Sequence, residues 1–195
     1  MLREKLSEMK ANGELPDVIT FAGNGEPTMH PDFAAIIDDT LLIRNELCPG
    51  AKIAVLSNST MLHKPKVVES LKKIDDNILK LDSAFIETIR LLDQPVGRYD
   101  LQKVIDNIKQ FDGQSIIQTM FIRGNFEGAE IDNTTDTELT AWIAVLQQIH
   151  PRLVMIYTIA RDTPAINLYK VSTDELEVIA ERVKRETNLE VQVSG

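Results

Sequence analysis

The sequence is poor in cysteine, in aromatic residues and in positive charge. Its 195 residues include one cysteine and 5% aromatics, and 21 Lys and Arg stand against 30 Asp and Glu, a net charge of −9. A lone cysteine, Cys48, excludes an internal disulfide and any metal or cluster site built from several cysteines of this chain. The acidic balance argues against broad attraction to nucleic acid.

Long apolar runs are absent as well. No stretch approaches the roughly 20 apolar residues that cross a bilayer. No basic segment followed by an apolar one opens the chain. We therefore expect a cytoplasmic protein with no membrane partner. The length predicts a single domain over residues 1–195.

Short runs rich in Val and Ile predict buried strands, and amphipathic segments between them predict helices. The predicted strands are Asp17–Ala22, Lys52–Ser57, Asn77–Asp82, Ser115–Ile122, Leu153–Ile159 and Leu189–Val193. Strict alternation of strands and helices predicts an α/β fold with a parallel sheet. The sheet is either doubly wound or curved like part of a (β/α)8 barrel, and in both cases ligands bind at the C-terminal strand ends.

Several local patterns predict where helices begin. Thr135 with Glu138, and Ser172 with Glu175, fit the capping box, and Pro31 and Pro65 fit the first turn of a helix. The acidic segment Asn125–Asn133 is either a lid on the substrate side or a solvated loop, and we favour the loop.

The first predicted strand ends in Gly23-Asn24-Gly25-Glu26-Pro27. The glycines let backbone approach a ligand closely, and Pro27 stiffens the turn. A carboxylate fixed at a strand end suits an ammonium group, which it would bind through charge-assisted hydrogen bonds. The alternative is an ordinary turn in which Glu26 caps the next helix.

The stretch Thr20–Asp32 resembles the glycine-glycine-glutamate-proline segment of radical S-adenosylmethionine (radical SAM) enzymes. It is most similar to iron–sulfur oxidoreductases that themselves resemble tRNA wyosine-base synthases and pyruvate formate-lyase activating enzymes. The resemblance implies a partial (β/α)6-type barrel with a mostly parallel, curved sheet. It also implies that Gly25 and Glu26, supported by Pro27, bind the amino group of S-adenosylmethionine.

Polar residues at the other strand ends are assigned to the S-adenosylmethionine site by the same resemblance. Their implied contacts are with the carboxylate, the ribose, the adenine or the substrate. These residues are Ser57, Asn58, Lys80, Asp82, Gln118, Thr158 and Arg161. Each has a simpler alternative: Ser57 and Asn58 cap a turn, Lys80 and Arg161 are solvated, or Asp82 pairs with Lys80.

The resemblance also implies a [4Fe–4S] cluster held by a C-x3-C-x2-C loop, and this sequence has no such loop. We expect a fragment that lacks the first strand and the cluster loop, so that the cluster belongs to the parent protein and this chain alone is inactive. The parent would cleave S-adenosylmethionine reductively to a 5′-deoxyadenosyl radical. The segment Asp17–Ala22 would then be a sheet edge through which chains could pair into a homo-oligomer. The substrate is not identified.

Two other function classes stay open. A metal-dependent β/α-barrel hydrolase would use Glu26, His30, His63 and Asp82 as ligands. A non-catalytic binding domain would keep the pocket without the chemistry.

Overall fold

The structure, a computed structural model, describes residues 1–23, 25–159 and 167–195. These residues form two compact units, Met1–Ile78 and Leu79–Gly195. Arg161 and Asn24 lie outside the described residues.

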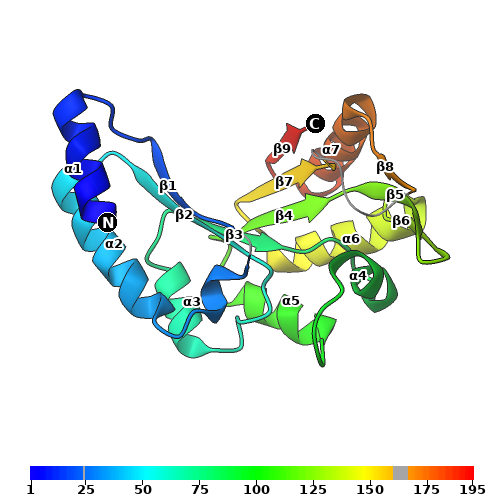
Figure 1. The fold of residues 1–195 in the computed structure, drawn as a ribbon. Helices are drawn as coiled ribbons and strands as arrows, with labels where there is room; N and C mark the ends of the chain where they lie inside the picture. Colours follow the sequence, from blue (N-terminus) through cyan, green and yellow to red (C-terminus); the bar gives the residue numbers. More distant parts are fainter. Residues whose placement is uncertain (24, 160–166) are drawn as a thin grey trace. The chain divides into compact units, whose positions relative to one another are not determined.

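Six strands are hydrogen-bonded in the order β1-β2-β3-β4-β7-β9 (Figure 1). The pairs β1–β2, β4–β7 and β7–β9 are parallel. This confirms the predicted α/β fold with a mostly parallel sheet. Because the order follows the chain without reversing, the doubly wound alternative is wrong. The strands are β1 Val18–Phe21, β2 Lys52–Ser57, β3 Asp76–Lys80, β4 Ile116–Met120, β7 Leu153–Tyr157 and β9 Val191–Ser194.

The first unit contains β1, β2 and most of β3, with three α-helices and a short 3₁₀ helix, η1. The helices are α1 Leu2–Asn12, η1 Pro27–Met29, α2 Phe33–Leu47 and α3 Pro65–Leu71. Helices α1 and α2 lie side by side (Figure 1). Leu6, Cys48 and Ala51 form a buried cluster, against which Leu2 and Met9 pack. Leu2, Leu6 and Met9 therefore form the face of α1 that packs in this cluster.

The second unit contains β4, β7 and β9 with four helices. The helices are α4 Ile86–Asp93, α5 Leu101–Lys109, α6 Asp136–Ile149 and α7 Thr173–Thr187. Neighbouring helices pack in chain order, α5 against α6 and α6 against α7. In the core, the rings of Phe121 and Trp142 meet edge to face, with centroids 5.2 Å apart.

A small antiparallel sheet in the second unit was not predicted. It consists of β5 Ile122–Phe126, β6 Ala129–Asp132 and β8 Leu168–Lys170, in the order β6-β5-β8. The loop predicted over Asn125–Asn133 is therefore wrong. The segment is a hairpin whose turn is closed by Gly128 N–H, which donates to Asn125 Oδ1 at 2.9 Å. Its acidic side chains hid the strand pattern because one face of the hairpin is solvated.

The predicted strand Ser115–Ile122 runs over the boundary between two strands, β4 and β5. Phe121 separates them, and its N–H donates to Tyr157 O at 2.8 Å. Because Met120, Phe121 and Ile122 at the boundary are all apolar, periodicity alone could not show the break.

The predicted helix starts are confirmed in part. Ser172 and Glu175 form a complete capping box at the start of α7, and Pro65 is in the first turn of α3. Thr135 caps α6, but the Glu138 carboxylate instead accepts from Ser83 and Thr88, at 2.6 and 2.5 Å. The prediction for Pro31 is wrong, because α2 begins at Phe33 after Asp32.

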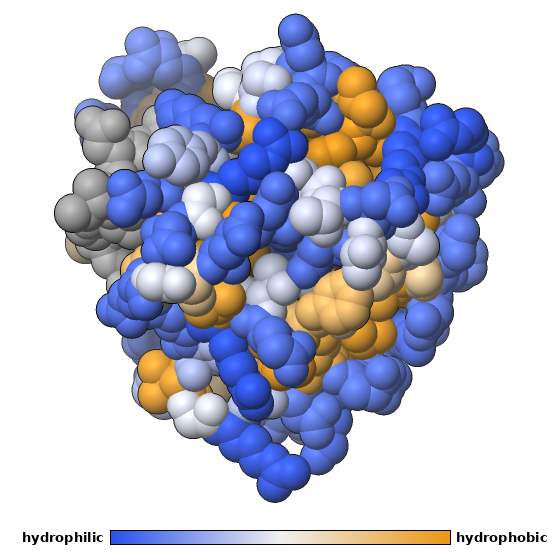
Figure 2. All heavy atoms as spheres, turned by 90° about the vertical axis from the view of Figure 1, so that its right-hand side faces the viewer, coloured by the Kyte–Doolittle hydropathy of each residue, from blue (hydrophilic) through white to orange (hydrophobic). Residues whose placement is uncertain are grey.

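The face of the molecule seen in Figure 2 is mostly hydrophilic, with apolar side chains gathered in small patches. This agrees with the high content of charged residues. No helix among the described residues is long and apolar enough to cross a membrane.

Candidate functional site

Glu26 follows β1 and is held by donors from η1 and from the end of β2. Its Oε2 accepts the Asn58 N–H at 2.6 Å, and its Oε1 accepts the Ser57 hydroxyl at 2.9 Å and the Thr28 N–H at 3.1 Å. The Thr28 hydroxyl also donates to Oε1. The carboxylate is therefore fixed in position before any ligand arrives.

The parallel pairing of β1 with β2 explains this arrangement. Phe21 is paired with Val55, so the two strands end close together. Ser57 is buried at the end of β2, whereas Asn58 is exposed and Glu26 is half-buried. Pro27 is the first residue of η1, and Glu26 caps that helix through Thr28. The simpler alternative, that Glu26 caps the next helix, is therefore confirmed, and this cap leaves Oε2 of the carboxylate outside the bond to Thr28.

The two oxygens of Glu26 are used unequally. Oε1 accepts three hydrogen bonds, whereas Oε2 accepts one within the described residues. A carboxylate offers about four lone-pair positions, two on each oxygen. Oε2 can therefore accept one more donor, and an ammonium group is a suitable one. Gly25, just before Glu26, is exposed, and no atom lies within 4 Å of the place a Cβ would take.

In the second unit, Lys80 and Asp82 form an ion pair of 2.7 Å. Lys80 also pairs with Asp93. Asp82 is 1% exposed, and its Oδ1 accepts the Met120 N–H at 2.8 Å. Burial raises the pKa of Asp82 to about 7; Lys80 opposes this shift and the nearby carboxylate of Asp93 adds to it. The pairing of Asp82 with Lys80, one of the simpler alternatives, is thus present.

Two tyrosines lie near this buried charge cluster. Burial, and then the negative charges of Asp93 and Asp82, raise the pKa of Tyr99. Burial and the charge of Asp82 also raise the pKa of Tyr157. Both phenols therefore stay protonated at neutral pH and are available as hydrogen-bond donors. Sequence reasoning missed Asp93 and Tyr99, because nothing in the local pattern links them to β3.

The remaining predicted residues of the second unit have varied surroundings. Thr158 is buried, and its hydroxyl accepts the Val171 N–H at 3.0 Å, which links the end of β7 to the start of α7. Gln118 is half-buried in β4, and its backbone carbonyl accepts from Leu81 N–H at 3.0 Å. Arg161 lies outside the described residues. Roles for these three side chains in binding a ligand stay predictions.

The chain's own donors do not fit an iron–sulfur cluster. Such a cluster needs several thiolates, and Cys48 is 1% exposed in the apolar cluster between α1 and α2. Within the described part of the chain, no three His, Cys, Asp or Glu side chains are grouped so that they could hold a metal ion. The hydrolase alternative, with Glu26, His30, His63 and Asp82, therefore gains no support.

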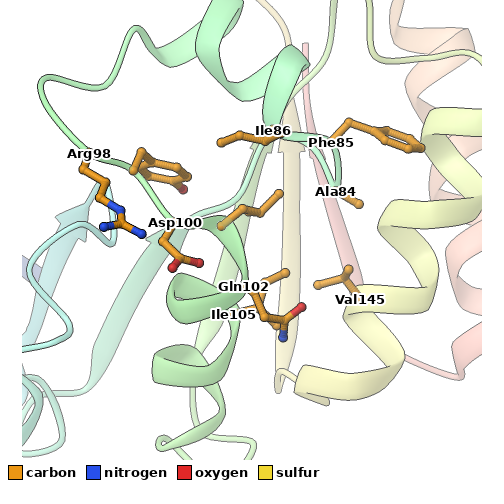
Figure 3. A pocket seen from close by; sticks show the side chains of 10 residues that line it. Ala84, Phe85, Ile86, Arg98, Asp100, Gln102, Ile105 and Val145 are labelled. Atoms are coloured by element: carbon orange, nitrogen blue, oxygen red, sulfur yellow. The ribbon is translucent and has the colours of Figure 1, made fainter.

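A depression of about 550 Å³ in the second unit contains none of the predicted site residues (Figure 3). It lies between the starts of α4 and α5 and one side of α6, and Arg98, Asp100 and Gln102 stand at its polar side. Its other lining residues are mainly apolar.

The chain has curated sequence relatives but matches no family model. It is 30% identical to the UPF0026 protein of Helicobacter pylori over 164 residues, which are 82% of this chain and 49% of that protein. The chain thus spans about half the length of this relative.

Solved structures share the fold, among them the following two. One is a domain of a pyruvate-formate lyase-activating enzyme from Bacteroides vulgatus, with a TM-score of 0.65 and 18% identity over 91% of this chain and 98% of that one. The other is Streptococcus suis SuiB bound to S-adenosylmethionine, with a TM-score of 0.67 and 19% identity over 100% of this chain and 43% of that one. At these identities, the likeness shows the fold alone.

Proposed function

We propose that this chain is the S-adenosylmethionine-binding part of a radical SAM enzyme and that Glu26 binds the amino group of S-adenosylmethionine. The Gly25-Glu26-Pro27 segment supports this, as does the fold shared with a SuiB structure that has S-adenosylmethionine bound. The observation that carries the proposal is the fixed Glu26 carboxylate with room for one more donor on Oε2.

The proposed contact is a charge-assisted hydrogen bond between an ammonium and Oε2 of Glu26. Such bonds contribute about 1.5–3 kcal/mol, or roughly a 10- to 100-fold change in affinity. Thr28, Ser57 and Asn58 hold the carboxylate in position. In the parent enzyme an iron–sulfur cluster would supply the electron for reductive cleavage. This sequence has a single cysteine and so does not supply the thiolates of such a cluster, and we assign no catalytic step to this chain.

The test compares S-adenosylmethionine with 5′-methylthioadenosine, which keeps the adenosine and the methylthio group but lacks the amino-acid portion and the positive charge of the sulfonium. Binding is followed by NMR chemical-shift titration of the chain. We expect Glu26→Gln to weaken S-adenosylmethionine binding at least about tenfold and to leave 5′-methylthioadenosine within about twofold. Glu69→Gln is the matched control, because Glu69 is exposed on α3.

Because Glu26 also caps η1, the thermal midpoint of each variant is measured beside its affinity. Equal losses for both ligands would show that the substitution disturbs the structure and would overturn the proposed contact. Unchanged affinity for S-adenosylmethionine in a folded Glu26→Gln variant would overturn it too.

A further inference from the structure

The first unit also contains a concave region. It includes Thr28, which bonds to Glu26, but Glu26 itself does not line it. It has a volume of about 570 Å³ and lies between η1, the start of α2 and the start of α3. A space of this size is ordinary for a small-molecule site. None of the ten residues predicted to bind S-adenosylmethionine lines it.

The floor and walls of this pocket are mostly apolar. The side chain of Met29 is 63% exposed there, whereas Phe33 and Val67 are buried beneath the surface. Ala34 and two prolines complete the apolar lining. This surface would release water on binding an apolar body.

The charge around the pocket is opposite in sign to that of the chain. The lining includes Lys64 and Lys66 and no Asp or Glu, although the chain carries 30 acidic residues against 21 basic ones. Within the described residues, neither lysine has an acidic partner, whereas Lys5, Lys52 and Lys73 each form an ion pair. Two unpaired ammonium groups beside an apolar surface favour an anion.

Two histidines add hydrogen-bonding groups to the lining, and backbone contacts fix which nitrogen each one presents. His30 Nδ1 accepts the Asp32 N–H at 3.1 Å, so the neutral ring carries its proton on Nε2 and can donate from there. His63 Nδ1 lies 3.0 Å from Thr60 O and must donate to that carbonyl, so Nε2 of its neutral ring is an acceptor and only His30 offers a ring N–H to an anion.

We propose that this pocket binds a small amphipathic anion, an apolar or aromatic body that carries a carboxylate, phosphate or sulfonate. The apolar body lies on Met29, Phe33 and Ala34, and the anionic group faces Lys64, Lys66 and the Nε2–H of His30. The proposal does not rest on S-adenosylmethionine binding, since neither Glu26 nor the ends of β1 and β2 line the pocket; Thr28, which also donates to Glu26, is the residue that the two sites share.

The experiment uses 8-anilinonaphthalene-1-sulfonate as the probe and N-phenyl-1-naphthylamine, the same ring system without the sulfonate, as the uncharged comparison. Binding is mapped in the full chain with ¹³C-methyl methionine. We expect the probe to shift the Met29 methyl resonance and not those of Met120 and Met155, which are in the other unit. The uncharged compound should bind at least tenfold more weakly.

Two variants separate the charge from the shape of the pocket. Lys64→Gln/Lys66→Gln should weaken sulfonate binding about tenfold and leave the uncharged compound within about twofold. Lys5→Gln/Lys103→Gln, at exposed lysines outside the pocket, is the control and should change neither. Ala34→Leu should weaken both compounds, because its larger side chain fills the apolar part.

An unmoved Met29 resonance at saturating probe would overturn the site. Equal affinity for the charged and uncharged compounds, or equal affinity of wild type and the Lys64/Lys66 variant in a folded protein, would overturn the assignment to an anion.

Discussion

Asn133 holds together three parts of the second unit, and its removal gives a sharp test of the structure. The residue is 2% exposed. Its Oδ1 accepts the Ile122 N–H at 2.9 Å, and its Nδ2 donates to Met120 O at 2.7 Å and to Asp82 O at 3.0 Å. One side chain therefore bonds the end of β4, the start of β5 and the segment after β3.

The structure gives the size of the effect. Asn133→Ala removes three hydrogen bonds and leaves three backbone groups in the interior without this partner. Each unsatisfied buried group costs about 1–3 kcal/mol, so with partial relaxation we expect a total loss of about 3–5 kcal/mol. Urea unfolding followed by circular dichroism measures it. Asn107→Ala, in the half-exposed part of α5, is the control and should stay within about 1 kcal/mol of wild type.

A second variant, Asn133→Asp, tests the direction of the bonds. The carboxylate can still accept from Ile122 N–H, but it would face two carbonyl oxygens unless it is protonated. Its pKa in the folded state should therefore lie above the unfolded value, so the difference in stability from wild type should shrink as the pH falls. A loss below about 1 kcal/mol for Asn133→Ala, or a pH-independent deficit for Asn133→Asp, would refute this reasoning.

Two further predictions concern buried charge and backbone conformation. Burial raises the pKa of Asp82 to about 7, so the folded state holds a proton that the unfolded state releases near pH 4. The free energy of unfolding should therefore fall as the pH rises between these two values. Asp82→Asn should flatten this slope, which urea unfolding at a series of pH values measures. Gly124→Ala should cost at least about 2 kcal/mol, because Gly124 has φ of +143° and a Cβ there would lie 2.0 Å from Asn167 O. Gly128→Ala, at φ of +88° with open space around it, should cost less, and equal thermal midpoints for the two variants would contradict the described packing.

The sequence predicted the main sheet well because its inner strands, such as β2, β3 and β4, are mostly buried. The predicted strand Lys52–Ser57 has an unbroken apolar run from residue 53 to 56, and the observed β2 has the same bounds. The hairpin of β5 and β6 was missed for the opposite reason. Its strands are short and partly solvated, and a polar segment of that length is equally typical of a loop.

For the candidate site, the sequence predicted the position of Glu26 but not what surrounds it. Ser57 and Asn58 were assigned to a ligand, and in the structure both donate to the Glu26 carboxylate. The reason is the register of β1 with β2, which brings the two strand ends together. Which residues bond across two strand ends depends on that register, and no local pattern encodes it. Thr28 was within reach of sequence reasoning, because a hydroxyl two residues after a capping carboxylate is a familiar local contact.

The structural and binding roles of Glu26 therefore support one another. A free glutamate side chain would lose up to about 1.5–2 kcal/mol of rotamer entropy when a ligand fixed it. Here Thr28, Ser57 and Asn58 have already fixed it during folding, so an ammonium group would not have to supply that cost. The bonds that make Glu26 a cap for η1 also present Oε2 in one orientation, and Glu26→Gln tests whether that orientation serves a cation.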